Sequence, residues 1–287
     1  MKILILGGTR FFGKLLVQNL IAEGHQVSVA TTGKTPLDFS ERVEHFNIER
    51  HSEESLVKAF AGHEWDLAYD QICYDANDAK ILALALKDKI GHLIFTSSQS
   101  VYDDGLVMSE ADFTAEVYEE NPQNKNSYQE GKRLAEKEYT TQLNFAVTSV
   151  RFPIVLGAND PSGRLLWHVS RVKNNLPIYF PNINSQIGFI SSEEAAQFLA
   201  WLKDKKLSGS INAGSPDSIS LRELMELIQA CVGSKSLLAE VDSVVSHSPF
   251  GLTSDWTMSM MKAEKLGYDF SPLKAWLPQL IAKLALD

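Results

Sequence analysis

The fold is decided by the stretch Ile3-Leu4-Ile5-Leu6-Gly7-Gly8-Thr9-Arg10-Phe11-Phe12-Gly13, in which a short apolar run leads straight into glycines. Residues 14–23 follow with apolar side chains at helical spacing, and Gly24 is placed to end that helix. An apolar strand begins at residues 27–30. A strand, a glycine turn, a helix and a second strand in this order predict a right-handed parallel crossover.

The alternation of strands and helices continues through the first half of the chain. Predicted helices occupy residues 52–60, with Ser52 as the N-cap, 77–86 and 128–139; predicted strands occupy residues 65–73, 92–97 and 145–151. This alternation indicates a doubly wound parallel α/β sheet with helices on both faces.

The rhythm changes after Pro153, where the segments become shorter and richer in Pro, Asn and Ser. We therefore expect a first domain over residues 1–155, to which residues 183–206 return. Residues 156–287 are expected to form mostly a smaller α/β lobe.

Composition excludes several classes of protein. The 287 residues are 44% hydrophobic and 22% charged, which is typical of a globular chain. A net charge of -9 disfavours broad nucleic-acid binding. Cys73 and Cys231 are the two cysteines, the N-terminal apolar run is too short for a signal segment, and no run is long enough to span a membrane. These features predict a cytoplasmic protein. The seven histidines show no metal-ligand spacing, so no metal site is expected.

The glycine stretch from Gly7 to Gly13 is a candidate phosphate cradle. Glycines let the backbone approach a diphosphate, and the following helix offers free N–H groups and a positive dipole end. Its position between the first strand and the first helix is the one that dinucleotide binding requires. The alternative is a tight turn in which Gly13 permits close packing of the helix on the sheet.

The end of the second strand bears on the choice of cofactor. Sheets that bind NAD usually carry Asp or Glu there for the ribose hydroxyls, whereas this chain has Thr31, Thr32 and Lys34. Hydroxyls and a lysine would accept a 2′-phosphate, and Arg10 could add a bidentate contact. We therefore expect NADP in preference to NAD; in the alternative interpretation, Lys34 and Arg10 are solvated surface cations.

Tyr128 and Lys132 are the candidate proton-transfer pair. Residues four apart lie on one face of a helix, and an adjacent ammonium favours the phenolate form of a tyrosine. Tyr128 is the one tyrosine with Lys at this spacing. Ser98 follows the strand at 92–97 and is a candidate to hydrogen-bond a reacting oxygen, while Ser97 and Ser100 suit a capping turn.

Taken together, these motifs resemble the extended branch of the short-chain dehydrogenase/reductase superfamily, the NAD(P)-dependent epimerases and dehydratases with a Rossmann fold. The resemblance covers nearly the whole chain and includes the glycine stretch, Ser98-x-x-Val101-Tyr102, Tyr128-x-x-x-Lys132, Val150-Arg151-Phe152-Pro153-x-x-x-Gly157, Gly188-Phe189-Ile190, Asn212-x-Gly214, Ser220-Leu221-Arg222-Glu223-Leu224 and Lys262-Ala-Glu-Lys-Leu-Gly267-Tyr268.

The resemblance implies roles for these residues. It assigns Tyr128 as the acid/base, Lys132 as the group that tunes it and binds the ribose, and Ser98 as the hydroxyl partner. It implies that the glycine stretch holds the diphosphate, that Pro153 borders the nicotinamide, and that the C-terminal lobe binds the substrate. By analogy with relatives, a homodimer is also expected.

Three further residues are weaker substrate candidates. Cys73 and Tyr74 follow a predicted strand and could line the nicotinamide crevice, although a small core residue is the commoner role for a cysteine. Arg164 could bind a substrate phosphate or form a surface ion pair.

The chain departs from the family pattern in three places. One is Asp103, which follows Tyr102 where the family usually has Gly and is expected to reshape only a loop. Arg10 replaces the usual second glycine, a form found in a subset that includes chloroplast stem-loop RNA-binding proteins. Gln99 and Ser100 stand where sugar-nucleotide dehydratases of this branch carry an Asp–Glu pair, so dehydration is disfavoured. The sequence therefore favours an NAD(P)-dependent oxidoreductase or epimerase acting on an alcohol or carbonyl, with sugar nucleotides as the substrate class that the resemblance implies. The alternative is a non-catalytic dinucleotide-sensing or RNA-associated protein.

Overall fold

A parallel sheet of seven strands forms the centre of one of the two units into which the chain folds. The structure is a computed structural model that describes residues 1–39, 43–142 and 144–286. The first unit comprises Met1–Tyr102, Glu110–Phe152 and Ala195–Ala213, and the second comprises Asp103–Ser109, Pro153–Glu194 and Gly214–Asp287.

The strands of the seven-stranded sheet run in the order β12-β7-β5-β4-β1-β2-β3, and every neighbouring pair is parallel. Their bounds are β1 Lys2–Leu6, β2 Gln26–Thr31, β3 Val43–Asn47, β4 Leu67–Asp70, β5 His92–Ser98, β7 Ala146–Phe152 and β12 Gly209–Asn212. The sheet confirms the predicted doubly wound parallel fold.

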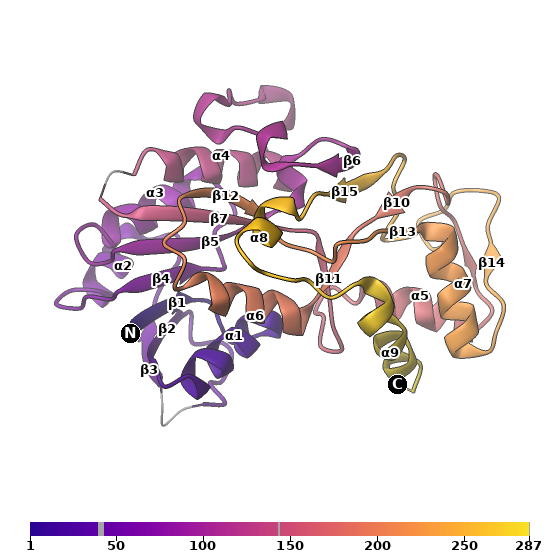
Figure 1. Cartoon of the computed structure of the whole chain (residues 1–287), viewed down its shortest axis with the longest axis horizontal. Helices are drawn as coiled ribbons and strands as arrows, with labels where there is room; N and C mark the ends of the chain where they lie inside the picture. The colour runs from indigo at the N-terminus through magenta and orange to yellow at the C-terminus, as the bar shows by residue number, and fades with distance from the viewer. Residues whose placement is uncertain (40–42, 143, 287) are drawn as a thin grey trace. The chain divides into compact units, whose positions relative to one another are not determined.

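Helices cover both faces of this sheet, with α2, α3 and α4 on one face and α1 and α6 on the other (Figure 1). Their bounds are α1 Phe11–Ala22, α2 Glu53–Ala59, α3 Ala76–Ala85, α4 Tyr128–Thr140 and α6 Ser192–Leu202. Short 3-10 turns follow β5 and precede α4: η1 Gln99–Val101, η2 Glu110–Asp112, η3 Ala115–Val117 and η4 Pro122–Asn124. The buried core between the sheet and α2–α4 includes Leu4, Leu82, Phe95 and Tyr139.

Side-chain caps fix where the helices begin. Ser52 accepts the N–H of Ser55 at the start of α2, as the sequence predicts. Ser127 accepts the N–H of Glu130 at 3.1 Å, so Tyr128 is the first residue of α4. The cap therefore sets the register of the helix that carries the candidate proton-transfer pair.

The second unit is built from short strands and four helices. A four-stranded sheet has the order β13-β10-β15-β6, and two further strand pairs are β11-β8 and β14-β9. The strands are β6 Gly105–Met108, β8 Ile154–Leu156, β9 Pro177–Ile178, β10 Gln186–Ile187, β11 Phe189–Ser191, β13 Ile219–Ser220, β14 Leu237–Leu238 and β15 Trp256–Met258. The helices are α5 Arg164–Lys173, α7 Leu221–Val232, α8 Met261–Lys265 and α9 Leu273–Leu286. Buried Val169, Leu224 and Leu277 join α5, α7 and α9 in one apolar core.

Three differences from the predicted elements concern the sheet. The strand expected over residues 65–73 is β4, which spans Leu67–Asp70, so residues 71–74 form the loop beyond it. The strands β3 and β12 were not predicted, because β3 is mostly exposed and β12 has no apolar run. The strand β12 belongs to the first unit, whereas the sequence assigns its residues to the smaller lobe expected over residues 156–287.

Candidate functional site

The glycine turn joins β1 to α1 at the carboxyl edge of the sheet. Gly7 and Gly8 have φ of 96° and 83°, in the left-handed region that favours glycine. A Cβ on Gly8 would lie 2.9 Å from Cγ2 of Val17, which a side chain cannot tolerate. Arg10 is the N-cap of α1 and its side chain makes no capping bond, so the N–H groups of the first turn are left for another acceptor. This geometry suits an anion.

Gly13 packs closely against its neighbours inside the turn. A Cβ there would lie 2.2 Å from Oε1 of Gln71 and 3.3 Å from the Cα of Gly8. The packing role that the sequence offers as an alternative is therefore compatible with a turn whose geometry suits an anion. Phe12, another residue of the predicted glycine stretch, packs its ring against that of Phe152, with 5.9 Å between the ring centroids.

The residues after β2 are unequal in what they can offer to a ligand. Thr31 is nearly buried, and its hydroxyl already contacts Nε2 of His45 at 2.9 Å and accepts the N–H of Gly33 at 3.2 Å. Thr32 and Lys34 are exposed. Arg10 donates from Nε to Oγ1 of Thr35 at 3.2 Å, so the side chain of the glycine turn reaches this loop. Thr35 was not predicted, because a threonine in a polar loop carries no distinctive pattern.

Lys132 lies buried on α4 with its ammonium directed at the carboxyl edge of the sheet. Nζ donates to the carbonyl of Cys73 at 2.7 Å and to that of Thr96 at 2.9 Å. The third N–H therefore has no oxygen partner among the described residues. Burial lowers the pKa of the Lys132 ammonium, and nearby acidic groups oppose that shift. The structure thus fixes the position of the Lys132 ammonium and leaves one of its N–H groups available to a ligand.

The rings of two tyrosines lie close to the ammonium group of Lys132. Nζ of Lys132 lies 5.7 Å from the ring centroid of Tyr128 and 5.2 Å from that of Tyr74. The two rings are 6.4 Å apart and both are about half exposed. Burial and the neighbouring Tyr128 raise the pKa of the Tyr74 phenol. The predicted pair Tyr128 and Lys132 is therefore brought together, and Tyr74 joins it from the loop after β4.

Cys73 differs from its neighbour Tyr74. Its side chain is fully buried, and burial raises the pKa of the thiol. What it contributes to the site is its backbone carbonyl, which accepts from Lys132. Of the two predicted residues, Tyr74 is the one whose side chain is exposed.

Ser98 ends β5 and serves as the cap of η1. Its Oγ accepts the N–H of Ser100 at 3.1 Å and donates to Oγ of Ser100 at 3.1 Å. Ser97 has a different role, because its Oγ donates to Glu136 at 2.5 Å. Gln99 is fully buried, and neither end of its amide has a partner among the described residues. The structure therefore adds an unpartnered polar group beside Ser98.

A buried ion pair anchors α4 to the sheet. Arg151 on β7 donates to Glu136 on α4 from Nη2 at 2.6 Å and from Nε at 3.0 Å. Its remaining donors go to the hydroxyl of Tyr102 and to the carbonyls of Glu110 and Phe113. These bonds fix the helix that carries Tyr128 and Lys132.

A second buried ionic cluster lies at the end of β4. Asp70 accepts from Nη2 of Arg50 at 2.9 Å and from the hydroxyl of Tyr139 at 2.7 Å. The neighbouring loop is held by Asp78, which accepts the N–H of Tyr74 at 3.0 Å. Sequence reasoning missed Arg50 and Asp70, because their pairing depends on tertiary contacts rather than on spacing.

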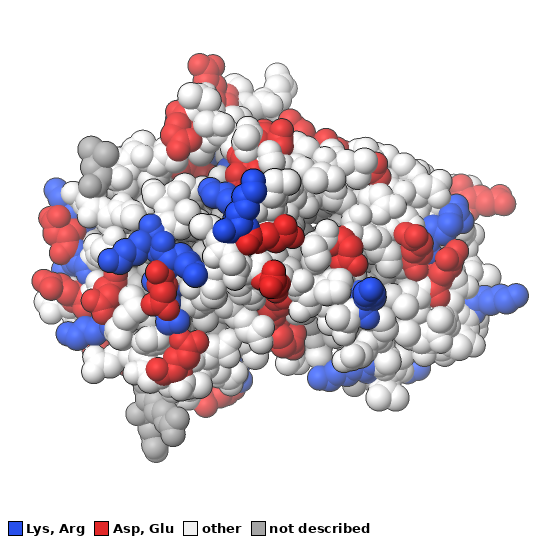
Figure 2. Space-filling model, in the orientation of Figure 1, with Lys and Arg blue, Asp and Glu red and all other residues white. Residues whose placement is uncertain are grey.

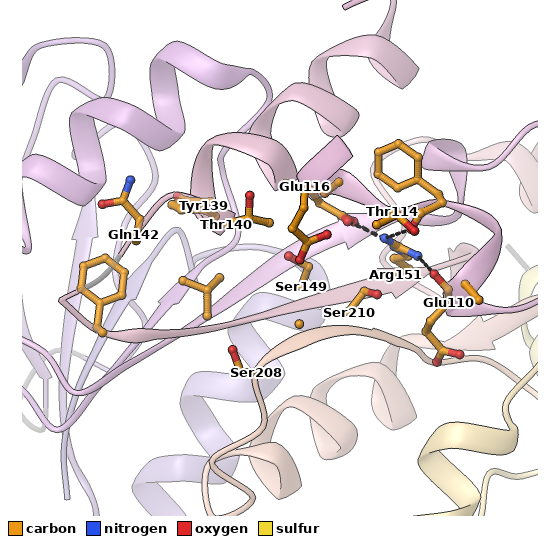
Figure 3. A pocket seen from close by; sticks show the side chains of 17 residues that line it. Glu110, Thr114, Glu116, Tyr139, Thr140, Gln142, Ser149, Arg151, Ser208 and Ser210 are labelled. Carbon is orange, nitrogen blue, oxygen red and sulfur yellow. Dashed lines mark hydrogen bonds and ion pairs between the residues drawn. The ribbon is translucent and has the colours of Figure 1, made fainter. Parts of the chain in front are cut away.

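A cavity of about 410 Å³ lies beside α4, between that helix, β7 and β12 (Figure 3). Figure 3 shows Arg151 at one end, with its bonds to the segment that contains Glu110. The walls are rich in hydroxyl and carboxyl groups, including Ser149, Ser210 and Glu116. None of the predicted site residues lines this cavity, so it is separate from the glycine turn and from Tyr128.

Two predicted residues belong to the second unit. Pro153 precedes β8, and Arg164 is the exposed first residue of α5. Among the described residues, no cluster of three or more His, Cys, Asp or Glu side chains could hold a metal ion. Within the same part of the chain, every helix is too short or too polar to cross a membrane.

Solved structures of low sequence identity share the fold. The UDP-glucose 4-epimerase of Thermus thermophilus, in complex with NAD, gives a TM-score of 0.78 at 19% identity, with 99% of this chain and 98% of that chain covered. The UDP-N-acetylglucosamine 4-epimerase of Bacillus cereus gives 0.75 at 18% identity, with 100% and 98% covered.

Curated relatives are similar over part of their length. The chloroplast stem-loop binding protein of 41 kDa b from Arabidopsis thaliana is 29% identical over 227 residues, which cover 73% of this chain and 57% of the relative. UDP-glucuronic acid decarboxylase 1 from Danio rerio is 24% identical over 268 residues, which cover 82% and 62%. The chain thus spans about three fifths of each relative. The sequence model of the NAD dependent epimerase/dehydratase family matches residues 3–214, and the chain belongs to that family.

Proposed function

We propose that the chain is an NAD(P)-dependent epimerase or reductase that acts on an alcohol or carbonyl carbon of a sugar nucleotide. The observation that carries this proposal is the placement of Lys132. Its buried ammonium lies 5.7 Å from the ring centroid of Tyr128, one helical turn away, and keeps one donor free of protein oxygens among the described residues.

The residues of the first unit fit a dinucleotide. Gly7 and Gly8 expose backbone at the turn, α1 begins there without a side-chain cap, and Nε2 of Gln71 is a buried donor without a partner among the described residues. The N–H groups at the start of α1 would hold the diphosphate, and Lys132 would hold a ribose hydroxyl. A bound nicotinamide dinucleotide supplies the acceptor or donor of hydride.

Three side chains of this chain would handle the proton. Tyr128 takes a proton from the substrate hydroxyl, or returns one to a carbonyl oxygen, as the carbon atom changes oxidation state. Lys132 stabilises the phenolate form of Tyr128 through its positive charge. Ser98 donates to the same substrate oxygen after giving up its bond to Ser100, which is 3.1 Å long.

We propose NADP as the preferred cofactor, with NAD as the alternative. Three exposed residues lie around the end of β2, namely Arg10, Thr32 and Lys34. The side chain of Arg10 is held at this loop by its hydrogen bond to Thr35. A guanidinium and an ammonium favour a 2′-phosphate. The hydroxyl of Thr31 is already engaged, since it accepts the N–H of Gly33. Thr31 therefore shapes the loop that would hold the 2′-phosphate and does not bind the phosphate itself.

Sugar nucleotides are the proposed substrates because relatives and neighbours of this chain include a UDP-glucuronic acid decarboxylase and UDP-sugar 4-epimerases. We place epimerisation or reduction ahead of dehydration. Gln99 and Ser100 carry no carboxyl group to protonate a leaving hydroxide, and the amide of Gln99 is buried.

The test is turnover of a sugar-nucleotide panel by the purified chain with NAD⁺ or NADP⁺, followed by product analysis. Tyr128→Phe should reduce kcat by roughly 100-fold or more while the Kd of the dinucleotide changes little, because general acid–base catalysis contributes about 10²- to 10⁴-fold. Tyr179→Phe, in the second unit, is the matched control and should behave as wild type. A Tyr128→Phe variant with full turnover would refute the assigned mechanism.

A second candidate function is a non-catalytic, dinucleotide-sensing or RNA-associated role. Arg10 in the glycine turn and the similarity to a chloroplast stem-loop binding protein favour it. The surface gives it little support. On the face in Figure 2, basic side chains lie among acidic ones, and the net charge is -9. Salt-dependent binding of a stem-loop RNA by a chain that turns over no sugar nucleotide would favour this second role.

A further inference from the structure

Gln71 belongs to the loop after β4, and its side chain lies against the glycine turn. Its backbone N–H donates to the carbonyl of Leu6 at 3.1 Å, which fixes the residue beside the end of β1. A Cβ built on Gly7 would lie 3.5 Å from the Cβ of Gln71, and one built on Gly13 would lie 2.2 Å from its Oε1. The side-chain amide therefore occupies the space where a Cβ on Gly13 would lie, and the side chain passes Gly7 at van der Waals distance.

One end of this amide is unsatisfied. Nε2 of Gln71 is buried and has no hydrogen-bond partner among the described residues. By contrast, Nε2 of Gln142 donates to the carbonyl of Glu138 at 3.3 Å and to Oγ1 of Thr141 at 3.2 Å. A buried donor without an acceptor destabilises a folded protein, so natural sequences rarely keep one without a use.

The surroundings indicate which acceptor would satisfy it. The nearby start of α1 presents backbone N–H groups and the positive end of its dipole. The nearest carboxylate in sequence, that of Asp70, is already engaged by Arg50, by Tyr139 and by the N–H of Ile72. A site that offers donors and has its nearby acceptor occupied favours an anion.

We propose that Nε2 of Gln71 donates to the diphosphate of the bound dinucleotide, as a side-chain ligand added to the backbone cradle. The inference rests on the proposed function, because it requires that the chain bind a dinucleotide. It also explains why Gly13 lacks a side chain, since a Cβ there would displace the amide.

The test is isothermal titration of the wild-type chain and its variants with NAD⁺, NADP⁺ and ADP-ribose, which share the diphosphate. Gln71→Leu keeps most of the bulk and removes the donor. It should weaken each ligand roughly 10- to 100-fold, the range for a hydrogen bond to a charged group. Gln71→Glu should weaken binding further, and the difference should shrink at high salt. Gln142→Leu is the matched control and should bind as wild type.

A second readout separates ligation from a structural role. The thermal midpoint of ligand-free Gln71→Leu should equal or exceed that of wild type, because the substitution removes an unsatisfied buried donor. Unchanged or tighter binding by Gln71→Leu would overturn the inference and leave the proposed function standing. Loss of affinity for NAD⁺ and NADP⁺ without loss for ADP-ribose would also overturn it. A wild-type chain that binds none of the three would refute both.

Discussion

Arg151, Lys132 and His168 are buried ionisable residues that differ in how far their hydrogen-bonding groups are satisfied. Arg151 keeps its charge because a carboxylate, a phenol and two carbonyls accept from it. Lys132 is held by two carbonyls, and its pKa is lowered by burial. His168 is fully buried between Phe180 and Phe250, and it contacts the carbonyl of Arg164 and the hydroxyl of Ser248. The imidazole is stable there in its neutral form.

The neutrality of His168 predicts a loss of stability in acid. Burial lowers its pKa from 6.5 to about 4 in the folded state. Between those values the unfolded chain binds a proton that the folded chain does not, so stability falls as the pH falls from 6.5 toward 4. The full effect of one such group is about 3 kcal/mol. Urea unfolding at several pH values, followed by tryptophan fluorescence, measures it.

His168→Gln isolates this contribution, because glutamine does not titrate. The variant should lose less stability than wild type between pH 7 and pH 4.5, whatever its stability at pH 7. His247→Gln, at an exposed position of the same unit, should keep the wild-type dependence. If the two variants show equal pH dependence, His168 is not the group responsible.

At the scale of the element, α4 is held on several sides by polar contacts. Glu130 accepts from the hydroxyl of Tyr118 at 2.6 Å and from the N–H of Asn121 at 2.8 Å. Lys137 donates to the carbonyl of Tyr118 at 2.6 Å. With Lys132 bound at the sheet edge, these contacts leave α4 little freedom to shift. A helix so constrained suits the proposed catalytic pair, which must keep its position.

Gly131 is predicted to resist substitution, although it lies within α4. In an exposed helix, Gly→Ala stabilises by about 1 kcal/mol. Here a Cβ would lie 2.2 Å from the carbonyl oxygen of Tyr74, so the helix and the loop after β4 would have to separate. Gly131→Ala should therefore destabilise the chain by roughly 1–3 kcal/mol. Thermal unfolding measures the change, with Thr140→Ala on the exposed face as the control.

The same substitution should impair the site that depends on this contact. Separation of α4 from Tyr74 would lengthen the bond between Lys132 and the carbonyl of Cys73. On the proposed function, turnover should fall in Gly131→Ala and stay near wild type in Thr140→Ala. A stabilised and fully active Gly131→Ala variant would contradict the packing described above.

The ion pair of Glu136 and Arg151 is predicted to be costly to break from one side. Both side chains are almost fully buried, so Glu136→Gln leaves a guanidinium without its counter-charge. The expected loss is about 3–5 kcal/mol. In Glu136→Leu combined with Arg151→Met, the loss should be smaller than the sum of the single losses by more than about 1 kcal/mol, because the two residues share one interaction. Additive losses in a urea-unfolding cycle would disprove the coupling.

An element could be predicted from the sequence where local residues determine it, and could not where contacts with distant residues determine it. The helix at Tyr128–Thr140 follows from local signals, namely the serine cap at Ser127 and a run of good helix formers without proline. The strand β12 depends on pairing with β7 far along the chain, and Gly209 and Ser210 give no local sign of it. The same distinction applies to the site. The spacing of Tyr128 and Lys132 is visible in the sequence, whereas the positions of Gln71 and Gln99 depend on tertiary contacts.

At the scale of the whole molecule, the chain alternates between its two units. The first unit is assembled from three segments, and Ala195–Ala213 is the last of them. Within it, the carbonyl of Leu199 accepts from the hydroxyl of Tyr69 at 2.9 Å, and Phe198 and Ile211 are fully buried. The sequence placed the returning segment at residues 183–206, whereas this unit takes residues 195–213. The difference includes the whole of β12.

This organisation predicts that residues 1–152 alone do not form a stable unit. Without residues 195–213, β7 loses its pairing with β12, and the face that receives Phe198 is exposed to water. A fragment that joins residues 1–152 to 195–213 through a flexible glycine–serine linker should regain a cooperative thermal transition by circular dichroism. On the proposed function, its midpoint should also rise with the preferred dinucleotide, because a ligand at about 100 times its Kd stabilises by about 2.7 kcal/mol. A cooperative transition at the same temperature in the shorter fragment would mean that residues 195–213 are dispensable. The segment would then only cover a sheet that folds without it.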